Sequence, residues 1–225
     1  NLWDHDLLTD AEGIDSAIPA FGGKASNYAI LPKIDQVAGG NLNPPDAFAV
    51  PVYFYDQFLV ENGFDVEIAE MLADPAFQDD AQTRDMRLQQ LRDDMMAAPL
   101  NPAFEQAMID KLDAEFPGVR MRFRSSTNAE DLDGFTGAGL YTSESGYTNP
   151  PMGAEDERFQ DAIREVWSSV WYFRAYEERE YRSIDHEAVG MSLLVHRSFP
   201  NEEANGVALT ANIFDTTGVE PGFYI

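Results

Sequence analysis

A strict alternation of apolar and charged residues between positions 119 and 124 is the clearest local pattern in the chain. Three apolar residues alternate with three arginines: Val119, Met121 and Phe123 against Arg120, Arg122 and Arg124. Side chains that repeat every second residue point to opposite faces of a strand, so the pattern predicts a half-buried β-strand. We expect a polar, glycine-containing loop, SSTNAEDLDGFTGAG, to follow it, and then an extended segment, LYTSESGYT.

Helical periodicity dominates the middle of the chain, from about Asp65 to Phe116. Apolar residues three and four apart define one face in each of two helices: Leu88, Leu91 and Met95, and then Phe104, Met108 and Leu112. Asn101-Pro102 marks a helix start, because the Asn side chain caps exposed amides and proline has no amide to leave unpaired. Asn62-Gly63 is a stop signal for the helix that follows the short strand AFAVPVYF.

The later part of the chain predicts one long helix followed by strands. Between Glu155 and Tyr181 an apolar stripe recurs at helical spacing: Phe159, Ile163, Val166, Val170 and Phe173, widened by Trp167 and Trp171. Three strand candidates come after it, GMSLLVHR, GVALTANIF and GFYI.

Charge and composition narrow the function classes. The 225 residues include 40 Asp plus Glu and 15 Lys plus Arg, a formal net charge of -25. So acidic a surface argues against nucleic acid and anionic membrane as partners. Cysteine is absent, which excludes disulfides, thiolate chemistry and Cys-based zinc sites. The chain has no run of about 18 apolar residues and no signal peptide at its start, and a cytoplasmic location is expected.

Arg124 is the centre of a candidate anion site. A guanidinium offers phosphate a planar fork of donors, and Ser125, Ser126 and the amides of the following glycines can add neutral donors. Those glycines are Gly134, Gly137 and Gly139. The alternative is that the strand arginines pair with some of the many carboxylates.

Lys24 is a second candidate for contact with an anion. It follows two glycines in FGGKASNYAILPKI, which reads as a glycine turn that enters a helix. Glycines allow close approach of a ligand, and a helix N-terminus favours negative charge. The GxxxxGK[ST] spacing of a P-loop is absent, and a surface lysine at a helix start remains the alternative.

Other polar residues give weaker indications. His5, His186 and His196 form no metal-binding or triad arrangement and are read as structural. Glu130 and Asp131 suit either a magnesium ion or the cap of a turn.

Several segments in a fixed order resemble the nucleotide-binding front of phosphoenolpyruvate synthase and pyruvate phosphate dikinase. They are FGGKASNYAIL, NPPDAFAVPVYFYDQFLVENG, VRMRFRSSTNAEDLDGFTGAG, AIREVWSSVWYFRAYEEREYRSIDHEAVGMSLLVHR and GVALTANIF. The resemblance, from about Phe21 to Ile225, implies an α+β (mixed α/β), ATP-grasp-like fold with ATP between two lobes. It makes 1–20 an N-terminal extension, 21–185 a first lobe with a helical insert at 65–116, and 186–225 part of a second lobe.

The resemblance also assigns roles to individual residues. Lys24 matches a lysine that contacts the nucleotide phosphates, and Arg124 matches the arginine that binds phosphate and steadies the transferring group. The stretch from Gly134 to Gly139 matches a flexible loop over the phosphates. His196 falls where relatives carry a glutamine near the adenine. Two further residues fall in a second-lobe strand near the nucleotide, Thr210 and Asn212.

ATP and Mg²⁺ are the ligands that this resemblance implies. Family members phosphorylate a histidine on a separate domain and pass the phosphate to pyruvate on a third. Those domains, and the late acidic magnesium ligands, are expected beyond Ile225. Residue 211 is alanine. Relatives often have an arginine there, so the resemblance implies the loss of one phosphate contact. The alternatives are a non-catalytic nucleotide-sensing or interaction module, or a dikinase that acts on a glucan or an antibiotic.

Overall fold

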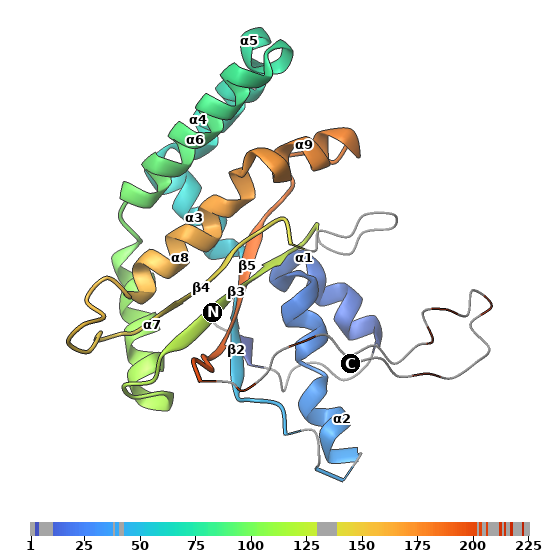
Figure 1. Cartoon of the computed structure of the whole chain (residues 1–225), viewed down its shortest axis with the longest axis vertical. Coiled ribbons are helices and arrows are strands. Elements are labelled where there is room, and N and C mark those ends of the chain that lie inside the picture. The colour runs from blue at the N-terminus through green and yellow to red at the C-terminus, as the bar shows by residue number, and fades with distance from the viewer. Residues whose placement is uncertain are drawn as a thin grey trace.

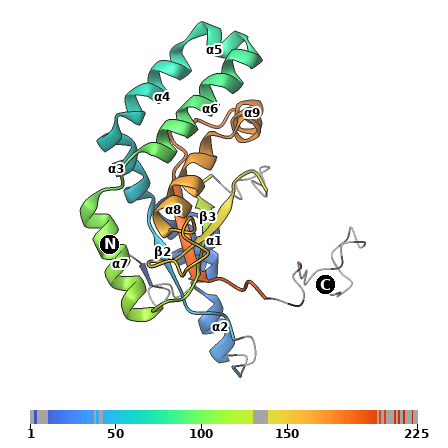
Figure 2. The ribbon, with the colours of Figure 1, turned by 60° about the vertical axis from the view of Figure 1, so that its left-hand side comes forward.

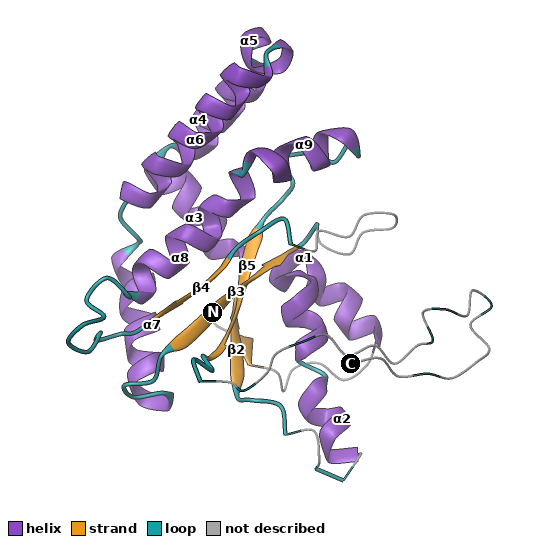
Figure 3. Ribbon diagram, viewed as in Figure 1, coloured by secondary structure: helices purple, strands orange, loops and turns teal. Residues whose placement is uncertain are grey.

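The computed structural model describes residues 3–4, 11–37, 39–40, 43–129 and 139–201, and the single positions 203, 206, 212, 214, 217 and 222. In this part of the chain, helices surround one five-stranded sheet (Figures 1 and 3), which confirms the predicted mixed α+β class. Within the described residues, no helix has the combined length and apolar character that crossing a membrane requires.

The sheet is antiparallel throughout. Its strands are β1 (Trp3–Asp4), β2 (Ala47–Val50), β3 (Met121–Thr127), β4 (Ser143–Gly146) and β5 (Met191–Arg197). Their order is β1-β2-β5-β3-β4, so β5 is the central strand and pairs with both β2 and β3. The predicted boundary between 185 and 186 falls just before β5, which therefore shares a sheet with segments assigned to the first lobe. The division into lobes stays a prediction.

The alternation in β3 is confirmed. Met121 and Phe123 are almost completely buried, whereas Arg122 is half-buried and Arg124 is exposed. Phe123 packs on the Phe159 ring with 6.5 Å between ring centroids. One face of β3 therefore belongs to the core, and the other carries the arginines.

The prediction of a polar loop that begins at Ser125 is wrong for the first three residues of that loop, because β3 continues through Ser125–Thr127. These residues are buried despite their hydroxyls. The Ser126 hydroxyl donates to the Phe21 carbonyl (2.8 Å) and accepts from the Ala25 amide (2.9 Å). A neighbouring helix thus replaces water as the partner of this serine, and that long-range contact cannot be read from local polarity.

The helices are α1 (Ala11–Tyr28), α2 (Leu31–Val37), α3 (Val52–Asn62), α4 (Phe64–Ala73), α5 (Pro75–Asp79), α6 (Ala81–Ala97), α7 (Pro102–Glu115), α8 (Phe159–Ser168) and α9 (Phe173–Tyr181), with a 3₁₀ turn, η2 (Ser169–Trp171), before α9. The predicted end signals are confirmed. The Asn101 side chain accepts from two amides at the start of α7, and Gly63 ends α3 with a φ of 78°. The predicted apolar faces of α6 and α7 are buried.

The single helix predicted over residues 155–181 is wrong, because the chain breaks between α8 and α9. The hydroxyls of Ser168 and Ser169 donate to carbonyls three residues earlier, at 3.0 and 2.6 Å. Such local bonds compete with the helical ladder. Tyr172 then adopts an extended conformation, with φ −61° and ψ 138°, before α9 begins.

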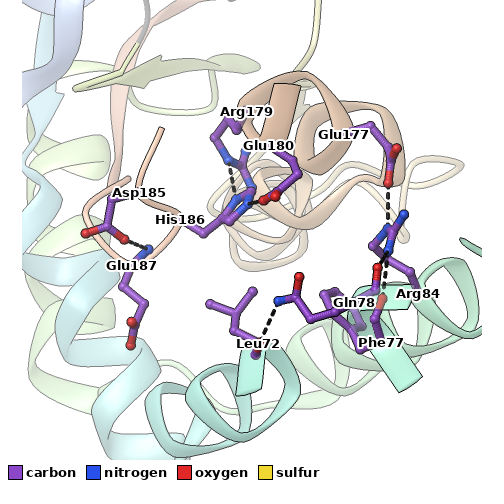
Figure 4. Close-up of polar contacts among 10 residues, drawn as sticks. All are labelled: Leu72, Phe77, Gln78, Arg84, Glu177, Arg179, Glu180, Asp185, His186 and Glu187. Carbon is purple, nitrogen blue, oxygen red and sulfur yellow. Dashed lines mark hydrogen bonds and ion pairs between the residues drawn. The ribbon is translucent and has the colours of Figure 1, made fainter. Parts of the chain in front are cut away.

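The helices α4 to α6 form an arm that extends away from the sheet (Figure 2). They belong to the middle segment predicted to be helical, and that prediction is confirmed. Arg84 joins the arm to α9. Its Nε donates to Glu177 Oε1 (2.6 Å), and its Nη1 donates to the carbonyls of Phe77 (2.7 Å) and Gln78 (2.8 Å) (Figure 4).

The two faces of the sheet are covered differently. One face packs against the helices in a single large apolar cluster. On the other face, α1 covers only part of the surface, where Ala25 and Ala29 contact Ala47, Ala49 and Leu194. Beyond α1, this second face carries the arginines of β3.

Candidate anion-binding site

An open cavity of about 450 Å³ lies over the second face of the sheet. Its walls come from β3, β4, β5 and the segment after β5. The lining residues are Arg120, Arg122, Arg124, Ser143, His196, Ser198, Phe199 and Pro200. We call it the arginine cavity. Three guanidinium groups and no carboxylate line it among the described residues, in a chain with a large excess of acidic groups.

The three arginines have different partners. Arg120 forms an ion pair with Glu157 and also donates to the Ser198 hydroxyl at 3.2 Å. Arg122 Nη1 donates to the Ser145 hydroxyl at 3.2 Å. Among the residues that the structure describes, the Arg124 side chain has no hydrogen bond or ion pair, and it is exposed. The alternative of arginine–carboxylate pairing therefore holds for Arg120, whereas Arg124 presents its donors to the cavity.

His196 lies opposite Arg122 in the β3–β5 pairing. Its Nδ1 is 2.7 Å from the Arg197 carbonyl, which can only accept, so Nδ1 carries the proton. Burial lowers the pKa of His196. The hydrogen bond to Arg197 opposes that effect, and the charges of Arg124 and Arg122 add to it. The imidazole thus favours the neutral form beside two cations.

The glycine turn before Lys24 is a sharp kink inside α1. Gly22 has a φ of 71° and a ψ of 168°, which separates the two helical parts of α1. Lys24 lies just after the kink, as the predicted glycine turn into a helix requires. The described residues that line the arginine cavity do not include Lys24. A joint contact of Lys24 and Arg124 with one anion therefore stays a prediction.

Arg124 is nevertheless close to the later part of α1. Burial and Asp46 raise the pKa of Tyr28 to about 12, and the positive charge of Arg124 acts against that rise. The Tyr28 hydroxyl donates to the Pro45 carbonyl at 2.5 Å. The helix that carries Lys24 thus ends near the Arg124 guanidinium.

Ser125 belongs to the buried face of β3. Its side chain alternates with Arg124, its exposed fraction is 3%, and its amide donates to the Ser143 hydroxyl at 3.3 Å. A role for Ser125 in binding stays a prediction. Ser143 lines the cavity directly and, like Ser145 and Ser198, was not singled out from the sequence. The signal available was the two-residue spacing of Ser143 and Ser145 in TSES.

The remaining predicted site residues are only partly described. Gly139 has a φ of 77°, and the next carbonyl, at Leu140, accepts from Arg174 Nε at 3.3 Å. Asn212 accepts a hydrogen bond from the Phe214 amide at 3.0 Å. Three predicted residues lie outside the described residues: Gly134, Gly137 and Thr210. The same holds for the alternative magnesium ligands Glu130 and Asp131, and no group of three His, Asp or Glu side chains in the described part could hold a metal ion.

Comparison with known proteins identifies the family. The model of the pyruvate phosphate dikinase AMP/ATP-binding domain matches residues 18–223. The chain belongs to this family. The resemblance drawn from the sequence motifs is confirmed, and nucleotide binding is the property that the family supports.

Curated relatives are similar at moderate identity. Phosphoenolpyruvate synthase of Aeropyrum pernix is 26% identical over 209 residues, which is 90% of this chain and 24% of the relative. The Escherichia coli phosphoenolpyruvate synthase is 26% identical over 190 residues, 82% of this chain and 22% of the relative. Rifampicin phosphotransferase of a Streptomyces species is 26% identical over 209 residues, 92% and 22% of the two chains. The chain spans about a quarter of the length of these relatives.

Proposed function

We propose that the arginine cavity binds the phosphate groups of ATP and that Arg124 is the principal phosphate ligand. The observation that carries this proposal is the exposed Arg124 guanidinium, which has no partner among the described residues and lines a cavity without carboxylates. A charged planar donor in such a place suits a phosphate oxygen. Membership of an AMP/ATP-binding family supports the same ligand.

The proposed nucleotide site also includes Lys24, the Gly134 to Gly139 loop, His196, Thr210 and Asn212. Their roles come from the family resemblance. The resemblance puts His196 near the adenine, whereas its observed position is among the arginines of the cavity proposed to bind phosphate. Ser125 contributes indirectly, because its backbone amide donates a hydrogen bond to the Ser143 hydroxyl at the cavity wall.

Magnesium does not fit the described residues of the cavity, since none of them is a carboxylate. Carboxylate and water oxygens are the ligands that Mg²⁺ prefers. We therefore place no magnesium ligand among the described residues that line the arginine cavity. In the proposed function Mg²⁺ is held by acidic residues elsewhere in the protein.

The chemistry proposed for the whole protein is phosphoryl transfer from ATP to a histidine on a separate domain. Such transfer depends chiefly on positioning and on stabilising charge on the phosphoryl group. Arg124 supplies a fixed positive charge for both tasks. In the proposal that we favour, the histidine then passes the phosphoryl group to pyruvate. An antibiotic is the second candidate acceptor, because the chain is similar to a rifampicin phosphotransferase.

Calorimetric titration of the full natural protein with ATP and Mg²⁺ tests the binding proposal. Arg124→Ala should weaken ATP binding about tenfold or more, because hydrogen bonds to charged groups contribute about 1.5–3 kcal/mol. Arg87→Ala is the matched control, because it removes the same charge from α6, where Arg87 pairs with Asp74. Equal affinities in the wild type and Arg124→Ala would refute the proposal.

Incubation of the same protein with labelled ATP separates an enzyme from a binding module. A phosphotransferase should accumulate acid-labile label on a histidine. Binding of ATP with no such label would favour the nucleotide-sensing or interaction module.

A further inference from the structure

Arg122 shares the cavity with Arg124 and is not neutralised as Arg120 is. Arg120 is paired with the Glu157 carboxylate. The partner of Arg122 in the described part of the chain is the neutral Ser145 hydroxyl, which occupies one of the five guanidinium donors. Arg122 therefore keeps its full charge and most of its donors on the cavity side of β3.

Arg122 also has a particular neighbour across the strands. It pairs directly with His196, while Arg124 pairs with Leu194. Directly opposed residues of an antiparallel pair project to the same face with Cβ atoms about 5 Å apart. Two opposed cations repel each other, which favours the neutral form of His196 when no anion is bound.

The nitrogen of His196 that changes on protonation can be assigned. Nδ1 is committed to the Arg197 carbonyl at 2.7 Å. Nε2 is therefore an acceptor in the neutral ring and becomes an N–H donor in the imidazolium. Because His196 lines the arginine cavity, this change affects what the cavity can bind.

We infer that Arg122 and His196 form a second phosphate-binding position beside Arg124, and that this position gains a hydrogen-bond donor when His196 takes up a proton. The inference rests on the proposed function, since the ligand is the polyphosphate of the nucleotide. Arg122 and Arg124 are two residues apart on one strand face, about 6.6 Å. This spacing allows the two guanidinium groups to contact neighbouring phosphates of one polyphosphate chain.

Proton uptake should accompany binding. The charged groups that act on His196 are Arg122 and Arg124 of β3. Burial is the largest cause of the lowered pKa of His196, and these two positive charges lower that pKa further. Arg197 of its own strand contributes the accepting carbonyl, and Arg120 in the same cavity is paired with Glu157. A bound polyanion offsets the charges of Arg122 and Arg124, so it favours protonated His196. Affinity for the polyanion should then rise as the pH falls toward the lowered pKa of His196 in the free protein.

The test is calorimetric titration of the full natural protein with ATP and Mg²⁺, in two buffers of different ionisation enthalpy. Arg122→Ala should weaken binding about tenfold, which is near the lower limit for a charge-assisted contact. Arg122→Gln retains a donor for Ser145 and is the second variant should the alanine variant fail to fold. His196→Asn should remove part of the proton uptake that accompanies binding. Proton exchange by the nucleotide itself is the same in the wild type and the variant, so it cancels in the comparison.

Arg197→Ala is the matched control, because it removes one positive charge from the adjacent position of β5. Arg197 lines a different cavity, with Asp46, Glu115 and Phe116 among its neighbours there. Its loss should change ATP affinity less than threefold, as expected for a screened surface charge. An equal effect of Arg197→Ala and Arg122→Ala would overturn the inference.

The outcomes also separate this inference from the proposed function. Weakened binding in Arg124→Ala, together with unchanged affinity in Arg122→Ala and Arg122→Gln, would overturn the second position and leave the proposed function intact. Unchanged proton uptake in His196→Asn would equally overturn it. Unchanged ATP affinity in Arg124→Ala would instead refute the proposed function.

Discussion

Gly22 lies so close to Ser126 that a Cβ atom at residue 22 would be 2.1 Å from the Ser126 carbonyl oxygen. The contact joins the kink of α1 to the end of β3. It brings the segment before Lys24 against the strand that carries Arg124. The two motifs proposed to bind phosphate are thus connected through their backbones.

Gly22→Ala should destabilise the protein by about 3 kcal/mol. A side chain at φ 71° and ψ 168°, a region occupied almost only by glycine, costs about 1–3 kcal/mol, and overpacking against fixed backbone adds about 1–3 kcal/mol. Gly118→Ala is the control, because Gly118 has nearly the same φ (69°) and open space around the added atom. The free energies of unfolding, measured with urea, should show a larger loss for Gly22→Ala, because only that variant also incurs the overpacking cost. Equal losses would show that the contact with Ser126 adjusts freely.

Arg84→Ala should loosen the arm formed by α4 to α6. The substitution removes the pairing with Glu177 and leaves two carbonyls, of Phe77 and Gln78, without their donor. The expected loss of unfolding free energy is about 2–3 kcal/mol, with faster amide exchange in α5 and α6. Glu177→Gln should cost about 0.5–1 kcal/mol, because the carbonyl contacts remain. Exchange rates in α5 and α6 that match the wild type would contradict this role of Arg84.

His186 should make the protein less stable in mild acid. Its Nδ1 accepts from Arg179 Nε (3.2 Å), so the proton is on Nε2, 3.0 Å from Glu180 (Figure 4). Burial lowers the pKa of His186, and the hydrogen bond with Glu180 only partly opposes this. In the unfolded chain His186 takes up a proton near pH 6.5, whereas in the folded protein it takes up a proton only at a lower pH. Stability should fall as the pH drops below about 6.5, by at most about 1.4 kcal/mol per pH unit.

The variant His186→Gln isolates this contribution. Unfolding free energies measured between about pH 7.5 and about pH 5 should give a shallower pH dependence for the variant than for the wild type. Asp80 and Glu155, whose pKa values are lowered by hydrogen bonds, contribute equally to both proteins. Parallel curves would show that His186 does not titrate differently in the folded and unfolded states.

Elements with a strong local signal could be predicted from the sequence. The β3 alternation, the Asn101 cap and the Gly63 stop each depend on residues next to one another. The break after α8 could not be predicted, because the apolar stripe of residues 155–181 continues across it. The break coincides with serine hydroxyls that bond to carbonyls three residues earlier, and serines do this in many helices as well.

The candidate site was predictable in its charged part only. Arg124 could be named because it is followed by a polar, glycine-rich stretch and because the motif matches a family. Ser143, Ser198 and the pairing of Arg122 with His196 depend on the register of β4 and β5 against β3. Register between strands far apart in the sequence is set by the packing of the whole sheet, which no short motif records.

The central place of β5 has a consequence for how the chain is made. The ribosome completes the other four strands before it reaches Met191, and β2 and β3 have no direct pairing with each other. During synthesis, β1–β2 and β3–β4 can exist only as separate pairs that await a middle strand. Contacts of such long sequence separation form slowly. A nascent chain paused before Arg197 would therefore expose two unfinished sheet edges to chaperones and to other nascent chains.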